Sequence, residues 1–157
     1  MYYRRKILLG LLEACGGRLS KTDMEKLLFA YCAERGVNHY DFFPHRFGCF
    51  SVLSYQDKGV LTQQGCLSDE DAFVLEPCKS VFADLEDDDK RALREFARKT
   101  SDLRGDALVR DMYLRYPYYA CRSEIKNRIL NSEELALVDA STPKDESSCL
   151  FTIGYEG

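Results

Sequence analysis

The chain of 157 residues lacks any apolar run that approaches the roughly 18 residues of a membrane-spanning helix. Its first residues, MYYRRKILLGLLEACGG, combine a basic start with a short apolar centre, but Glu13 interrupts that centre before any small-residue cleavage site. The segment is therefore predicted to continue as an amphipathic helix rather than to act as a signal peptide. We expect a cytoplasmic protein that has no membrane partner.

The seven cysteines form no Cys-x-x-Cys pair, and the only histidines, His39 and His45, stand apart from any cysteine pair. Zinc sites are usually built from such close pairs, so we predict no metal and no cofactor. An odd number of scattered cysteines instead fits reduced thiols that pack as small apolar side chains in a bacterial cytoplasm.

Motifs that carry catalysis are also missing, because the chain has no glycine-rich phosphate loop, no nucleophile elbow and no convincingly spaced carboxylate pair. Asp87, Asp88 and Asp89 stand at a predicted helix start. Consecutive acids there point in different directions and stabilise the positive end of the helix dipole. We therefore predict that the chain is not an enzyme.

The net charge of -4 is divided into blocks along the chain. Residues 1–58 have a balance of +3 and residues 69–89 a balance of -8, whereas residues 90–130 have +6 and residues 131–157 have -5. A polyanion would meet both basic blocks only if folding placed them on one face. The acidic balance weakens a nucleic-acid function without excluding it.

Three helices are predicted in the first part of the chain. Apolar residues recur at helical spacing from Tyr3 to Cys15, and Ser20 or Thr22 can cap a second helix that ends at Gly36. Ser51 can cap a third helix, and a serine hydroxyl there would satisfy a free backbone N–H of its first turn.

Two other segments of this part are predicted from composition. The aromatic stretch HYDFFPHRFGCF, residues 39–50, contains proline and glycine, so we expect an ordered loop with at most a short strand. Acidic residues 68–72 precede an apolar strand at residues 73–77, and this run is expected to form a two-stranded wing.

The predicted fold is mainly α with a small β-hairpin. Three helices followed by a hairpin is the winged-helix arrangement, so residues 1–80 are predicted to form a winged-helix-like N-terminal module. Residues 81–131 form a C-terminal helical annex packed on it, and residues 132–150, rich in serine, proline and acids, form a polar linker. Residues 151–157 are expected to be the first strand of a domain that is missing here.

That last expectation comes from a resemblance. The closing residues FTIGYEG closely resemble the opening of a bacterial family whose members begin with a Thr-Ile-Gly-Tyr-Glu-Gly strand and turn (domain of unknown function 488). The stretch TDMEKLLFAYC followed by YDFFPHRFGCFS resembles the N-terminal helical region that precedes this domain in some members. The resemblance implies a separate N-terminal module whose parent protein has two parts.

A fainter resemblance connects the chain with the Panacea antitoxin group. Members of that group pair a Lys-Leu-Leu helix with an aromatic-Pro-x-x-aromatic-Gly-Pro segment, and here residues 26–29 (KLLF) and residues 43–48 (FPHRFG) stand at the matching places. This similarity implies an interaction protein that binds a toxin. Neither family supplies a catalytic residue for this segment.

The third predicted helix offers one set of candidate binding residues. Ser51, Ser54 and Tyr55 can read base edges or contact a partner, while Arg46 and Lys58 can anchor phosphates. Acids at the expected wing tip, residues 69–71, would repel a nucleic-acid backbone.

A second set lies in the predicted annex, where Arg110, Arg115, Tyr118 and Arg122 accompany the aromatic stretch YPYY. Arginines interleaved with aromatic rings can stack on bases or grip phosphates. The alternative is that the tyrosines fill the junction between the annex and the wing.

We therefore expect a recognition or regulatory module that binds a protein partner or double-stranded DNA through a winged-helix-like surface. A self-standing antitoxin-like interaction protein, which binds a toxin or forms a homodimer through residues 39–50, is the alternative. A third and weaker alternative is a part of an enzyme whose catalytic domain is absent here.

Overall fold

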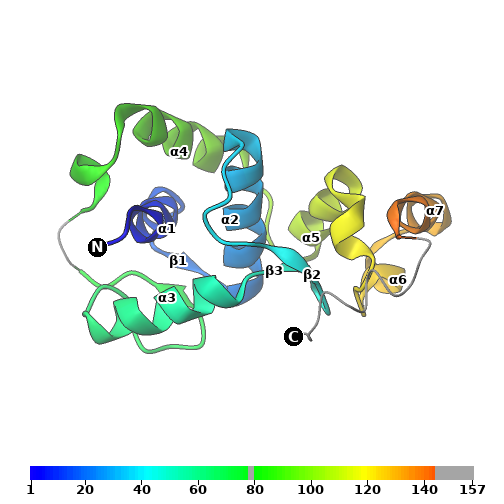
Figure 1. Cartoon of the computed structure of the whole chain (residues 1–157), viewed down its shortest axis with the longest axis horizontal. Coiled ribbons are helices and arrows are strands. Elements are labelled where there is room, and N and C mark those ends of the chain that lie inside the picture. Colours follow the sequence, from blue (N-terminus) through cyan, green and yellow to red (C-terminus); the bar gives the residue numbers. More distant parts are fainter. Residues whose placement is uncertain (78–79, 144–157) are drawn as a thin grey trace.

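The computed structural model describes residues 1–77 and 80–143, and within them the chain is mainly helical with two small antiparallel sheets (Figure 1). The predicted strand at residues 151–157 lies outside the described residues. The elements are α1 (Tyr3–Ala14), β1 (Arg18–Leu19), α2 (Lys21–Arg35), β2 (Phe43–His45), β3 (Gly48–Phe50), α3 (Val52–Gln63), β4 (Phe73–Val74), α4 (Asp87–Lys99), α5 (Gly105–Arg115), α6 (Lys126–Ile129) and α7 (Ser132–Ser141), with 3-10 turns η1 (Phe82–Asp84) and η2 (Pro117–Ala120).

Helix α1 lies at the centre of the N-terminal part, with α2, α3 and α4 around it (Figure 1). All six residues 7–12 are buried, so the helix contributes apolar side chains to the core in several directions. A Cβ atom on Gly10 would lie 3.0 Å from the Cδ1 atoms of both Leu85 and Leu93. Glycine at this position therefore allows the segment that leads into α4, and α4 itself, to approach α1 closely.

Helix α2 begins and ends at the predicted residues. The Ser20 hydroxyl accepts a hydrogen bond from the backbone N–H of Asp23 at 3.0 Å, and Gly36 ends the helix with a left-handed backbone. The helix packs against α1 and β1 on one side and against α5 and β3 on the other. This double contact explains why residues 24–32 are all buried, including two charged side chains.

Strand β4 pairs with β1, with Arg18 opposite Val74 and Leu19 opposite Phe73. On its other side Leu67 and Leu75 form an antiparallel bridge, and the Ser68 N–H donates to the Val74 carbonyl oxygen at 2.8 Å. The predicted apolar strand is thus present, and its partners are β1 and the segment that follows α3.

Residues 39–50 contain a β-hairpin, whereas the sequence predicted a loop with at most a short strand. In this hairpin Phe43 pairs with Phe50 and Pro44 with Cys49. Gly48 has a φ of +102°, and a Cβ atom there would lie 2.8 Å from Cε1 of Tyr113. The hairpin forms because glycine permits both this turn and the close contact with α5.

Residues 132–141 form helix α7, where the sequence predicted part of a polar linker. A capping box between Asn131 and Glu134 begins the helix, and Val138 is fully buried with Val109 and Tyr113 in a second, smaller hydrophobic cluster. The buried Val138, the partly buried Leu135 and the capping box outweigh the polar composition of this segment. The division into modules at residues 80 and 131 stays a prediction.

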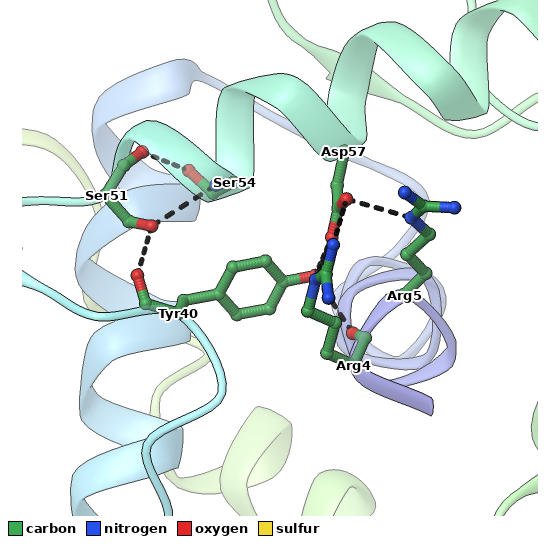
Figure 2. A network of polar contacts seen from close by, with 6 residues as sticks. All are labelled: Arg4, Arg5, Tyr40, Ser51, Ser54 and Asp57. Atoms are coloured by element: carbon green, nitrogen blue, oxygen red, sulfur yellow. Dashed lines mark hydrogen bonds and ion pairs between the residues drawn. The ribbon is translucent and has the colours of Figure 1, made fainter. Parts of the chain in front are cut away.

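Helices α1 and α3 are joined by a buried ion-pair network around Asp57 (Figure 2). The Arg4 guanidinium donates through Nε to Oδ2 of Asp57 at 2.8 Å and through Nη2 to Oδ1 at 3.1 Å, and Arg5 Nε donates to Oδ1 at 2.8 Å. The Tyr40 hydroxyl adds a hydrogen bond to Oδ2 at 2.8 Å. Both arginines of the basic start are therefore engaged by one buried carboxylate inside the fold.

Burial raises the pKa of the Asp57 carboxyl, but hydrogen bonds from Arg4, Arg5 and Tyr40 outweigh burial and hold it below its ordinary value. A depressed carboxyl pKa contributes stability above the unfolded-state pKa. That contribution is lost as the pH falls through the folded-state pKa. The network thus stabilises the fold at neutral pH and weakens in acid.

Replacing Asp57 with asparagine should lower the free energy of unfolding by about 3 kcal/mol at pH 7, because two partly buried arginines lose their counter-charge. Urea denaturation measures this loss, which should shrink below pH 4 as the wild-type carboxyl becomes protonated. Asp102→Asn, at an exposed position, is the matched control and should stay within about 0.5 kcal/mol of wild type. An equally small effect at Asp57 would contradict the central role of this network.

Candidate functional site

Ser51 and Ser54, predicted as binding residues, are fully buried and have structural roles instead. The Ser51 hydroxyl donates to the Tyr40 carbonyl oxygen and accepts from the Ser54 N–H at 3.2 Å, which confirms it as the cap of α3 (Figure 2). The Ser54 hydroxyl donates to Oε1 of Glu25 at 2.6 Å. Neither hydroxyl can reach a base edge or a partner, so this part of the prediction was wrong.

Tyr55 and Lys58 are half-buried side chains of α3. The Lys58 ammonium donates to the Glu70 carbonyl oxygen at 2.9 Å and lies 5.7 Å from the centre of the Phe73 ring. Tyr55 stacks on Phe50, with ring centres 5.3 Å apart. Both residues therefore contact neighbouring elements and also reach the surface.

The acidic loop after Leu67 neutralises the cations of this face. Arg18 pairs with Glu70 at 3.0 Å, and Lys21 pairs with Asp71. Exposed ion pairs of this kind contribute little stability, but they place carboxylates beside these cations, where the carboxylates would repel phosphate groups.

The annex residues are held mainly by ion pairs between helices. Arg110 of α5 pairs with Glu134 of α7, and Arg115 pairs with Glu34 of α2 at 3.2 Å and with Asp111 at 3.5 Å. These two arginines therefore hold α5 against its neighbours and do not converge on one site.

The tyrosines of the annex are largely packed, but against α2 and Ser123 rather than at the predicted junction with the wing. Tyr113 is buried and donates to the Ser123 hydroxyl at 2.7 Å, while Tyr116 and Tyr119 pack on Phe29 with ring centres 4.9 and 4.6 Å away. Tyr118, which is 38% exposed, is the most accessible ring of this group.

Arg46 and Arg122 are brought towards one place, beside His45. Arg46 lies at the turn of the hairpin and pairs with Glu124 at 3.1 Å, and both side chains of the pair are more than half exposed. Burial lowers the pKa of His45, and the positive charges of Arg46 and Arg122 lower it further, more than Glu124 raises it. The potential beside His45 is therefore positive.

The hairpin closes over a pocket of about 220 Å³ that no sequence motif indicated. It lies between the start of α2, the hairpin and the start of α3. Its principal lining residues are Glu25, Lys26, His45, Phe47, Phe50 and Tyr55. We call the four aromatic members, His45, Phe47, Phe50 and Tyr55, the hairpin face.

Three rings of the hairpin face form a continuous stack. His45 and Phe50 are 4.8 Å apart between ring centres with planes inclined by 28°, and Phe50 and Tyr55 are 5.3 Å apart with planes inclined by 26°. Phe47, at the tip of the hairpin, leaves 49% of its surface exposed. The result is an aromatic surface that continues from the hairpin onto α3.

Glu25 lies against the start of α3, almost wholly buried. Its Oε1 accepts from the Ser54 hydroxyl and its Oε2 from the Ser51 N–H at 3.0 Å. Burial raises the pKa of this carboxyl to about 7, although these two hydrogen bonds and the charge of Lys26 lower it. Glu25 therefore holds its proton to a higher pH than an exposed glutamate does.

Lys26 is also buried, with only 2% of its surface exposed. Its ammonium donates to the Cys49 carbonyl oxygen at 3.1 Å. An ammonium group has three N–H donors, and no carboxylate of residues 1–77 or 80–143 forms an ion pair with this one. Lys26 thus places a buried cation at the lining of the pocket.

Sequence reasoning named Arg46, Tyr55 and the aromatic residues 39–50, which line this pocket, but it missed Glu25 and Lys26. These two are neighbours on a helix, where charged residues usually face solvent, and the hairpin and the start of α3 bury them. The one available signal was the aromatic content of residues 39–50, which indicated packing on a core without showing where.

Other site classes find no support in the described part of the chain. Residues 1–77 and 80–143 contain no group of three or more histidine, cysteine or acidic side chains placed to hold a metal ion. No helix among these residues is long and apolar enough to cross a membrane.

Comparison with protein-family models, with curated proteins and with solved structures gave no match.

Replacing Glu25 with glutamine should remove a pH dependence of stability. Because the folded-state pKa of about 7 exceeds the ordinary glutamate value of 4.5, the folded protein holds an extra proton between these values, and wild-type stability falls as pH rises through this window. The difference in unfolding free energy between wild type and Glu25→Gln should change by about 2.5 kcal/mol between pH 5 and pH 8.

Urea denaturation at several pH values measures this change. Because His45 titrates in both proteins, its contribution cancels when the unfolding free energy of the variant is subtracted from that of wild type. Glu133→Gln, at an exposed position of α7, is the matched control and should give a constant difference. A constant difference for Glu25→Gln as well would show that the buried carboxyl has an ordinary pKa.

Proposed function

We propose that this chain is a non-catalytic recognition module that binds a protein partner through the hairpin face, within a two-part bacterial protein. The observation that carries the proposal is the half-exposed Phe47 beside an aromatic pocket that is also lined by Lys26 and Arg46. Aromatic residues that surround a pocket are typical anchors of protein interfaces.

A winged-helix-like arrangement of the N-terminal module is part of this proposal. It is supported by the order α1, β1, α2, α3, β4, in which the β2–β3 hairpin is inserted between α2 and α3, by the pairing of β4 with β1, and by the bridge between Leu67 and Leu75. In such a module α3 takes the place of the recognition helix, and residues 68–73 take the place of the wing.

Protein binding is favoured over DNA binding by the state of the polar residues. The serines of α3 are buried, Arg4 and Arg5 are paired with Asp57, and Glu70 and Asp71 approach the remaining cations. Phosphate contacts need cations that are free to displace counterions. The surface that would meet a DNA backbone offers few of these.

Incorporating a photo-crosslinking amino acid in place of Phe47 should yield one dominant adduct in cells, whereas the same amino acid in place of the exposed Leu137 of α7 should not. An adduct at twice the mass of the chain would identify a second copy as the partner, in agreement with the homodimer alternative. Equal labelling at both positions would contradict a specific surface.

The partner identified by crosslinking should then be purified without the crosslink. It should bind the Phe47→Asp variant about 30-fold more weakly than it binds the wild-type chain, because an interface anchor contributes about 2 kcal/mol. Leu137→Asp, which also places a charge at an exposed apolar position, should bind with unchanged affinity. Isothermal titration calorimetry gives both dissociation constants, and circular dichroism verifies that both variants are folded.

The DNA alternative makes an opposite prediction about the acidic loop. If phosphate contacts are suppressed by Glu70 and Asp71, the double variant Glu70→Gln/Asp71→Asn should bind a 20-base-pair duplex more tightly than wild type at about 50 mM salt, and lose this gain at about 200 mM. Wild type should bind no better than the roughly 10⁻⁴ M of non-specific complexes. Fluorescence anisotropy measures both proteins, and tight wild-type binding to any duplex would overturn the preference for a protein partner.

A further inference from the structure

The pocket beneath the hairpin is small for a cofactor or nucleotide. Sites for small-molecule ligands usually enclose about 300–1,000 Å³, whereas this pocket has about 220 Å³. A space of that size suits a single large side chain, as at the centre of many protein interfaces.

The rings of the aromatic stack are largely engaged by their neighbours. His45 and Tyr55 both stack on Phe50, with ring centres 4.8 and 5.3 Å from that of Phe50. The Lys21 ammonium lies 5.9 Å from the centre of the Tyr55 ring, and Phe43 contacts His45 edge to face. Base stacking on a single-stranded nucleic acid needs an open ring face, so this arrangement disfavours it.

Ring edges and a buried ammonium complement the same kind of group. An aromatic ring has a negative face and a positive edge, so any ring edge of His45, Phe50 or Tyr55 that lines the pocket attracts the face of an incoming ring. Lys26, with one hydrogen bond to a carbonyl oxygen and 2% exposure, attracts that face as well.

The rim of the pocket favours negative charge next to this ring. Arg46 lies at the rim, and its pair with Glu124 is exposed on both sides, so a partner carboxylate can replace Glu124 at little cost. Arg122 adds to the positive potential beside His45. Glu25 is the opposing charge in the pocket, and it is already engaged by Ser51 and Ser54.

We propose that this pocket receives an aromatic side chain of the protein partner, flanked by an acidic residue that pairs with Arg46. The inference rests on the proposed function and names the chemistry by which the hairpin face selects its partner. The aromatic ring enters the pocket with its face towards Lys26 and the ring edges, and the carboxylate stays at the rim.

The experiment uses the full chain and four labelled heptapeptides in NMR titrations. The probe peptide is Gly-Ser-Asp-Phe-Asp-Ser-Gly. The comparison peptides replace its phenylalanine with leucine, replace it with alanine, or replace both aspartates with asparagine. Amide signals of residues 26 and 45–50 should shift with the probe, and each comparison peptide should bind at least tenfold more weakly.

Matched variants test separately the contact of Lys26 with the aromatic ring and the pairing of Arg46 with the carboxylate. Lys26→Met keeps the length of the side chain without its charge and should weaken the probe peptide about tenfold while leaving the leucine peptide unchanged. Arg46→Glu should abolish the preference for aspartate over asparagine. Arg91 is an exposed arginine of α4 that is likewise paired with an acid, so Arg91→Glu is the control. This variant should keep the preference for the aspartate peptide over the asparagine peptide. Thermal unfolding verifies that each variant is folded.

Three outcomes would overturn the inference. The first is that no amide signal near the pocket shifts at about 2 mM peptide. The second is that all four peptides bind with equal affinity. The third is that a ten-residue oligothymidine shifts the same signals at a lower concentration than the probe peptide does. Equal peptide binding would leave the proposed function intact as long as Phe47→Asp still weakens the crosslinked partner. Loss of that effect would remove the proposed function itself.

Discussion

The buried carboxylate of Asp57 holds three distant parts of the chain together. It receives hydrogen bonds from two arginines at the start of α1 and from Tyr40, whose carbonyl oxygen in turn accepts from the Ser51 hydroxyl (Figure 2). A charge inside a protein is stable only when such partners surround it, so the position of α3 is fixed by the positions of α1 and of the segment before the hairpin.

The same network leads to the pocket. Ser51 caps α3 and also donates its N–H to Glu25, while Ser54 donates its hydroxyl to the same carboxyl. Helix α2 is thereby tied to the start of α3, and the hairpin between them closes over Glu25 and Lys26. Residues that hold the fold together therefore also set the polarity of the proposed binding site.

The sequence predicted the local elements of this arrangement well and their neighbours poorly. The caps Ser20 and Ser51 and the ends of α1 and α2 follow from short-range rules of helix capping and apolar spacing, and the structure confirms them. The serines also illustrate the limit, because the same residues were predicted to contact a partner. A capping hydroxyl and an exposed hydroxyl are the same letter in a sequence, and only burial separates them.

What the sequence determined by itself is a mainly helical chain with short strands, because periodicity and capping act over a few residues. Tertiary structure alone decided that two acidic loop residues lie against the cations of β1 and α2, that residues 132–141 form a packed helix, and that Glu25 and Lys26 are buried under a hairpin. These outcomes depend on contacts between residues far apart in the chain, whose free energy comes from burial and charge pairing. No local pattern of residues carries that information.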